Sequence, residues 1–192
     1  MRKQTMTTKT NAPRLTAVDP ETATGKTQTL LTSVKAALGL TPNMMRTMAN
    51  SPAVLEGYLQ FNAALGKGAL RAGLREEIAL AVAEANSCDY CLSAHSTLGQ
   101  LAGLNDNQIE ASREAKSADP KEDAALKFAV AVVKSRGSVS DAEFARVRAA
   151  GFGDGEIAEI LAHVAINVFT NYFNKTALTV VDFPRVEAKK AA

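Results

Sequence analysis

The 192-residue chain contains no tryptophan, and aromatic residues make up only 5% of it. Surfaces that bind single-stranded nucleic acid by base stacking need aromatic side chains. Charge of one sign is also lacking, because 22 Lys and Arg against 20 Asp and Glu leave a formal net charge of +2. Such a balance gives no broad attraction for nucleic acid or an acidic membrane surface. We therefore expect neither nucleic acid nor a membrane as a partner.

Long apolar runs are absent too. The longest apolar segment, Ala158 to Phe169, contains His163 and Asn167 and is shorter than the roughly 18–20 residues that cross a bilayer. Residues 1–14 are rich in Thr and Lys and have no apolar stretch of the kind found in secretory signals. We predict that residues 1–14 form a flexible tail and that the protein is cytoplasmic.

Helix start and stop signals recur along the chain. Asp119 followed by Pro120 has the form of an N-cap and a first-turn proline, and Ser140 with Glu143 has the form of a capping box. Between such signals, apolar residues recur at helical rather than strand spacing. The pattern predicts helices over residues 29–38, 52–65, 74–86, 120–136, 141–150 and 154–180.

The length and the hydrophobic content of 46% fit one domain with a sizeable core. We predict an all-α, single-domain helical bundle over residues 15–186 and a short C-terminal tail over residues 187–192. In the last long helix, six apolar side chains are expected to form the buried face: Ile157, Ile160, Leu161, Val164, Val168 and Tyr172. Asn167, Asn171 and Asn174 are expected to make interhelical hydrogen bonds, and His163 to be a core or interface residue.

Only two cysteines are present, and both lie in the short segment from Ser87 to His95. Cys88 and Cys91 are close enough in sequence to cycle between dithiol and disulfide. If a helix starts near Ser87, both cysteines and His95 share one face at about 100° per residue. His95 then lies one turn beyond Cys91 and can exchange a proton with it.

Two features leave the assignment of roles open. The helix dipole favours Cys88 as the more acidic thiol, whereas the position of His95 favours Cys91; we follow the histidine. On the preceding helix, Glu76 and Glu77 are adjacent, so one of them is expected to face the interior. A buried carboxylate has a raised pKa, which suits it for transferring a proton near neutrality.

The spacing of four residues resembles a known family signature. Glu76, Cys88, Cys91 and His95 fit the pattern E-x11-C-x2-C-x3-H of the alkylhydroperoxidase D-like proteins, which belong to the carboxymuconolactone decarboxylase superfamily. The similarity extends from about Thr41 to Pro184. Within this range, the chain resembles the peroxidase-related branch of the superfamily in three stretches: SPAVLEGYLQFNAAL, REEIALAVAEANSCDYCLSAH and NVFTNYFNKTALTVVDFP.

The resemblance implies an all-helical fold that forms homo-oligomers (a dimer, trimer or hexamer) and a thiol-dependent peroxidase without haem, metal or flavin. By this resemblance, Cys91 is the peroxidatic thiolate and Cys88 the resolving cysteine, while Glu76 and His95 form a proton relay. The substrate is a hydroperoxide, and a dithiol or a thioredoxin-like protein is the reductant.

The chain departs from the family pattern at two positions. Tyr90 stands where relatives often carry a histidine before the second cysteine, and Lys175 follows Asn174 where a histidine is expected. Two alternatives remain. One is a lactone enzyme of the carboxymuconolactone decarboxylase type, and the other is a non-catalytic helical oligomer that senses redox state or binds a metal.

Overall fold

The computed structural model describes residues 12–189, and within them every regular element is an α-helix. The predicted flexible tail lies outside the described residues except for positions 12–14, and so do the last three residues of the predicted C-terminal tail. The helices are α1 (Gly25–Leu38), α2 (Asn43–Met48), α3 (Pro52–Leu65), α4 (Ala72–Ala85), α5 (Asp89–Leu101), α6 (Asp106–Arg113), α7 (Pro120–Ser135), α8 (Asp141–Ala149) and α9 (Asp154–Ala177). The all-α prediction is confirmed.

The predicted helix caps are present in the structure. The Asp119 carboxylate accepts hydrogen bonds from the backbone N–H groups of Lys121 and Glu122 at the start of α7. At the start of α8, Ser140 and Glu143 form the reciprocal bonds of a capping box. Side-chain acceptors at these positions satisfy N–H groups that have no partner inside the helix.

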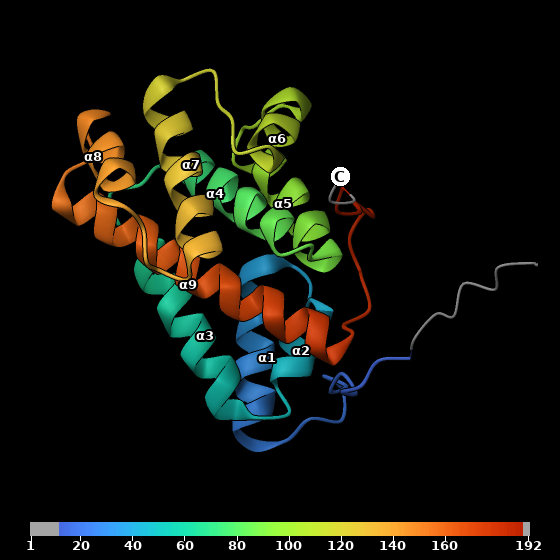
Figure 1. Cartoon of the computed structure of the whole chain (residues 1–192). Coiled ribbons are helices and arrows are strands. Elements are labelled where there is room, and N and C mark those ends of the chain that lie inside the picture. Colours follow the sequence, from blue (N-terminus) through green and yellow to red (C-terminus); the bar gives the residue numbers. More distant parts are fainter. Residues whose placement is uncertain (1–11, 190–192) are drawn as a thin grey trace, which may run out of the picture.

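Helix α4 is the central element of the bundle (Figure 1), and it contacts α5, α6, α7 and α9. Its sequence is apolar on nearly every side, which is typical of a helix surrounded by others. Leu80 and Ala83 join a core cluster with α1, α2 and α5, whereas Leu74, Ile78 and Val82 join a second cluster with α7 and α9. The two clusters therefore meet at α4.

The buried face of α9 differs from the prediction. Ile157, Ile160 and Val164 are buried, but Leu161 and Tyr172 are 40% and 59% exposed. Residues four apart on a helix are rotated by about 40° relative to each other. Positions 168 and 172 therefore turn progressively away from the buried face that contains Val164. Besides Ile166 and Ala177, the buried residues there are polar, namely Asn167, Thr170, Asn171 and Asn174. The C-terminal half of α9 thus presents carboxamides to the interior.

The chain end returns to α5. The backbone N–H of Val186 donates to Ser93 Oγ and that of Ala188 donates to Asp89 Oδ1, each at 2.9 Å, and the ring of Phe183 packs edge-on against Tyr90. Figure 1 shows this last segment beside α5 and α6. Part of the predicted C-terminal tail, up to residue 189, therefore lies against the bundle.

Glu77 is a buried carboxylate, only 1% exposed. Arg71 Nη2 lies 3.0 Å from Glu77 Oε2 and also contacts Glu122 on α7. Burial and the charge of Glu122 outweigh the attraction of Arg71 and raise the pKa of Glu77 to about 7. The folded state thus holds a proton on Glu77 at pH values where the unfolded chain has lost it.

Replacing Glu77 by glutamine is expected to stabilise the protein at high pH. The pKa of Glu77 is higher in the folded state than in the unfolded chain. Its contribution to the free energy of unfolding of the wild type is therefore fully present below about pH 4.5 and is lost as the pH rises through about 7. The loss amounts to about 3 kcal/mol at roughly 1.4 kcal/mol per pKa unit. Urea unfolding of Glu77→Gln at pH 5 and pH 8 measures it. The difference in the free energy of unfolding between Glu77→Gln and the wild type should be larger at pH 8 than at pH 5. The control Glu21→Gln, at an exposed site, should show no such change with pH. An equal difference at both pH values for Glu77→Gln contradicts the assignment.

Candidate active site

The connection between α4 and α5 brings both cysteines to one place. After α4, Ser87 adopts the left-handed conformation, with φ of 51°, and Cys88 N–H donates to Ala83 O at 2.9 Å. This is the geometry of a Schellman turn. Cys88 is then the N-cap of α5, and its Sγ accepts the Cys91 N–H at 3.4 Å. The predicted helix start near Ser87 is thus displaced by only two residues.

Both cysteines are free and buried, and Cys91 is the more acidic. Burial opposes ionisation of Cys91, but hydrogen bonds from the Cys88 thiol and the Asn174 amide, together with the charge of His95, lower its pKa to about 7. Hydrogen bonding to Cys91 and burial raise the pKa of Cys88. A neutral Cys88 thiol therefore stabilises a thiolate at Cys91, the order expected from His95 rather than from the helix dipole.

Glu76 and His95 are in direct contact across α4 and α5. Glu76 Oε2 lies 2.8 Å from His95 Nδ1. Burial opposes the charged imidazole, but the neighbouring carboxylate favours it, and the net effect raises the pKa of His95. Both side chains remain 22% exposed, so the pair can exchange protons with solvent as well as with the sulfur one turn away.

The prediction that one of the two adjacent glutamates faces the interior is confirmed for Glu77. The expectation that the buried carboxylate is also the proton-transfer group needs correction, because Glu77 pairs with Arg71 while Glu76 contacts His95. Neighbouring helical positions point about 100° apart. Two carboxylates side by side in the sequence therefore reach separate environments.

Two asparagines on α9 complete the surroundings of Cys91. Asn174 Nδ2 donates to Cys91 Sγ at 3.4 Å, and Asn171 Oδ1 accepts from Asn86 Nδ2 at 2.9 Å. The predicted interhelical bonds are therefore present for Asn171 and for Asn174, whose acceptor is a sulfur. For Asn167 the prediction is wrong, because its Nδ2 donates to the His163 carbonyl within α9 at 2.8 Å. The spacing of Asn167, Asn171 and Asn174 on one helix face is the signal in the sequence that points to this site.

Tyr58 on α3 was not identified from the sequence. It packs against the core cluster that contains both cysteines. Burial, with smaller contributions from the charges of Glu76 and Cys91, raises the pKa of Tyr58, so the phenol stays neutral. No sequence motif marks it, because α3 approaches the site only through tertiary packing.

The two departures from the family pattern have defined structural roles. The Tyr90 hydroxyl accepts the backbone N–H of Met44 at 3.0 Å. Lys175 Nζ donates to the Asn86 backbone carbonyl at 2.5 Å, which fixes the end of α4. His163 is buried, as predicted, and burial together with the charge of Arg75 lowers its pKa.

Among residues 12–189, no group of three or more His, Cys, Asp or Glu side chains is arranged to hold a metal ion. In the same part of the chain, no helix combines the length and apolar content that a membrane crossing requires.

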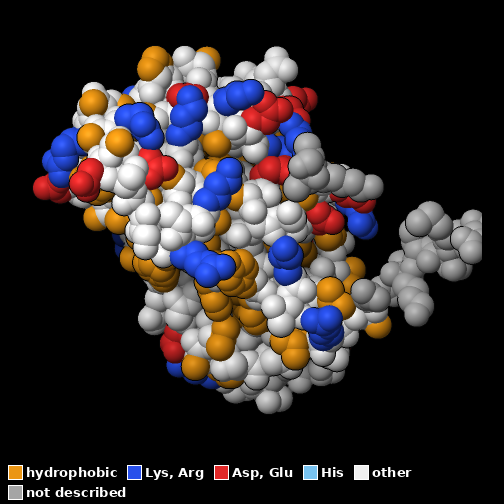
Figure 2. Space-filling model, in the orientation of Figure 1, with side chains coloured by type: hydrophobic (Ala, Val, Ile, Leu, Met, Phe, Trp, Pro, Cys, Tyr) orange, Lys and Arg blue, Asp and Glu red, His pale blue; other side chains and the backbone are white. Residues whose placement is uncertain are grey.

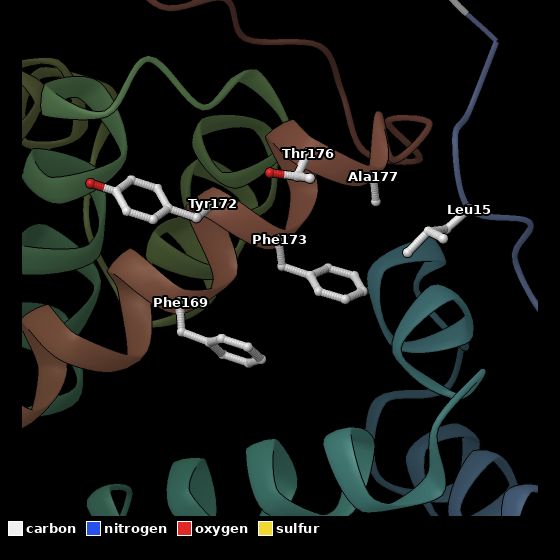
Figure 3. Close-up of a pocket in the computed structure, with 6 residues that line it drawn as sticks. All are labelled: Leu15, Phe169, Tyr172, Phe173, Thr176 and Ala177. Atoms are coloured by element: carbon white, nitrogen blue, oxygen red, sulfur yellow. The ribbon is translucent and has the colours of Figure 1, made fainter.

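An apolar surface lies over α3 and α9, outside the cysteine site. Val54, Phe61, Phe169 and Tyr172 are exposed there, and Figure 2 shows hydrophobic side chains gathered where these two helices lie in Figure 1. Two pockets open onto this face, and Phe169 lines both. In the pocket of Figure 3, about 330 Å³ in volume, the rings of Phe169 and Phe173 point to the same side of α9. The lining of this pocket contains no acidic, basic or sulfur-containing side chain.

Comparison with known proteins supports the resemblance noted in the sequence. Residues 52–131 match the model of the carboxymuconolactone decarboxylase family. No curated protein matches the chain. Among solved structures, a peroxidase-related protein from Ralstonia eutropha JMP134 with an alkylhydroperoxidase AhpD core is similar, with 25% identity and a TM-score of 0.80 over 88% of this chain and 92% of that one.

Two further structures share the fold. A peroxidase-related protein from Silicibacter sp. TM1040 is 22% identical with a TM-score of 0.76, covering 92% of this chain and 95% of that one. A variant of the debrominase Bmp8, solved in complex with 2,3,4-tribromopyrrole, is 23% identical with a TM-score of 0.76, covering 88% of this chain and 91% of that one. The family match over residues 52–131, the helical architecture and these neighbours together support the similarity of the chain to AhpD-like proteins of the carboxymuconolactone decarboxylase superfamily.

Proposed function

We propose that this protein is a thiol-dependent peroxidase that reduces hydroperoxides through Cys91 and Cys88. The observation that carries the proposal is the acidic Cys91 thiol, which lies between a neutral thiol at Cys88 and the Glu76–His95 pair. A thiolate is the nucleophile in thiol chemistry, and a positioned imidazole is the most common general acid or base.

In the first step, the Cys91 thiolate attacks the distal oxygen of a hydroperoxide. The O–O bond breaks, an S–O bond forms, and the leaving alkoxide takes a proton from the His95 imidazolium to give an alcohol. Cys91 is oxidised to the sulfenic acid. Glu76 stabilises the charged imidazole before this transfer, because its carboxylate contacts Nδ1.

In the second step, the Cys88 thiol condenses with the sulfenic acid. The sulfur of Cys88 displaces hydroxide from Cys91 Sγ, and the Cys88 proton leaves with it as water, with His95 and Glu76 as the proton carriers. The product is a disulfide between residues three apart. An external dithiol or a thioredoxin-like protein then returns both cysteines to thiols and is itself oxidised to a disulfide.

The fold by itself does not select this chemistry, since one fold supports many reactions. The debrominase Bmp8 has the same architecture, and the superfamily takes its name from a lactone decarboxylase. Decarboxylation of a lactone needs no pair of redox thiols. The paired cysteines beside an ion-paired histidine favour the peroxidase.

The proposal is tested by a thiol count on the reduced protein. A stoichiometric amount of an alkyl hydroperoxide should consume both thiols, form one alcohol per chain and leave an intramolecular disulfide visible by mass spectrometry. Added dithiol should restore the thiols and allow repeated turnover. Slow, non-stoichiometric thiol loss without turnover would instead support redox sensing, and lactone turnover in a chain with both cysteines replaced would support the decarboxylase.

The homo-oligomeric assembly and the cytoplasmic location implied by the sequence stay predictions. Sedimentation velocity on the purified chain decides between a monomer and a dimer, trimer or hexamer.

A further inference from the structure

A buried polar stripe on α9 lies against the cysteine helix. Asn171 is fully buried and Asn174 is 3% exposed. Burying carboxamides costs free energy unless each polar atom finds a partner, and a leucine or valine would continue the apolar face of this helix at no such cost. Helix packing alone therefore does not explain why carboxamides occupy these positions.

The two carboxamides are oriented by different contacts. Asn171 Oδ1 accepts from Asn86 Nδ2, whereas the buried Asn171 Nδ2 has no hydrogen-bond partner among residues 12–189. Asn174 Nδ2 donates to Cys91 Sγ at 3.4 Å. The hydrogen bond from Asn174, with a smaller contribution from the Asn171 amide, favours the charged form of that sulfur.

We propose that Asn171 and Asn174 form an amide pair that binds the anionic sulfur of Cys91 and thereby selects Cys91, rather than Cys88, as the nucleophile. The inference rests on the proposed function only in taking Cys91 as the reacting thiol. Asn86 acts as a positioning residue, because it fixes the amide of Asn171 without touching the sulfur.

An amide pair is suited to this task because it donates without carrying a proton that titrates. A hydrogen bond to a charged group stabilises it more than a bond to a neutral one. Since the Asn174 amide donates to Cys91 Sγ, it acts directly on that sulfur, unlike the dipole at the start of α5, which acts on both sulfurs. The amide contact therefore distinguishes the two cysteines, whose roles the sequence alone left open.

Other titratable groups surround Cys91, and the test must separate them from the amides. They are Cys88 at the N-cap of α5, Tyr90 and His95 on α5, Glu76 on α4, Tyr58 on α3 and Lys175 on α9. None of them is altered by substitution at Asn174, so a change in Cys91 ionisation in that variant reports on the amide.

The experiment measures the rate of Cys91 alkylation by iodoacetamide as a function of pH, with the modified peptide identified by mass spectrometry. In the wild type the rate should rise with a midpoint near pH 7. Asn174→Leu, which is similar in volume, should raise the midpoint by about one pH unit, since one hydrogen bond to a charge is worth about one pKa unit or more. At pH 7 the rate should then fall about fivefold.

Asn167→Ala is the matched control. Asn167 lies on the same buried face, but its Nδ2 donates to the backbone carbonyl of His163 at 2.8 Å and not to sulfur. A purely structural role for the stripe predicts that both variants lose stability and that neither moves the midpoint. An unchanged midpoint in folded Asn174→Leu overturns the proposal.

Asn86→Ala provides a second route if Asn174→Leu does not fold. Asn86 lies at the end of α4 and is only partly buried, so its truncation leaves the core intact. Loss of the Asn171 orientation should raise the midpoint by about half a unit. A wild-type midpoint in this variant would remove Asn171 from the pair. Because alkylation needs no peroxide, these results stand apart from the outcome of the turnover assay.

Discussion

Replacing Cys91 by serine is expected to abolish peroxide reduction, with a loss of at least about 10³-fold in turnover. A serine hydroxyl is not ionised near neutral pH, whereas the Cys91 thiol has a pKa of about 7 and is substantially thiolate there. The measurement is the rate of hydroperoxide consumption with a dithiol reductant at pH 7. Retained turnover in a folded Cys91→Ser protein contradicts the assignment of the nucleophile.

Cys88→Ser separates the two half-reactions. Without reductant, this variant should still react once with hydroperoxide, and the Cys91 sulfenic acid should then persist, because no neighbouring thiol condenses with it. Trapping with a sulfenic-acid reagent gives one label per chain. In Cys91→Ser the remaining Cys88 thiol is still buried, which raises its pKa, and it should stay unlabelled. Reversal of the two patterns would exchange the roles of the cysteines.

Glu76→Gln is expected to lower peroxide turnover by about 10²–10³-fold, the usual contribution of general acid–base catalysis. Glutamine can still hydrogen-bond to His95 Nδ1, but it removes the negative charge that raises the pKa of His95. Less imidazolium is then available to protonate the leaving oxygen. The pH–rate profile should show the descending limb, which reports loss of the His95 proton, at lower pH than in the wild type.

Glu77→Gln is the matched control for this variant. The substitution is the same, one residue further along α4, but Glu77 pairs with Arg71 and does not contact His95. Its turnover should remain close to wild type while its stability at high pH rises. If Glu77→Gln loses turnover and Glu76→Gln keeps it, the proton relay runs through Glu77 and not through Glu76.

Local signals allowed most of the fold to be predicted. The caps at Asp119 and Ser140 act within three residues, so the sequence alone identifies them. The predicted end of the last helix, near Val180, was too late, because Leu178 leaves the helix in a left-handed conformation with φ of 52°. Leucine has no special preference for that conformation, so the sequence contains no stop signal there.

The site was predictable where its residues share one helix or a fixed spacing. Cys88, Cys91 and His95 are related by helical geometry, and Glu76 was matched by the family pattern. The contact of Asn174 with sulfur depends on how α9 crosses α5, and Tyr58 depends on the placement of α3. Such long-range packing leaves only an indirect trace in the sequence, a polar face where apolar residues are expected.

The return of the chain end to α5 has a consequence for biosynthesis. The bond from Ala188 to Asp89 joins positions 99 apart, so the cysteine helix gains this contact only after residue 188 has left the ribosome. Domains fold as synthesis proceeds, and contacts between distant positions form late. A nascent chain stalled before residue 188 has emerged therefore carries its two thiols on a helix that still lacks this contact.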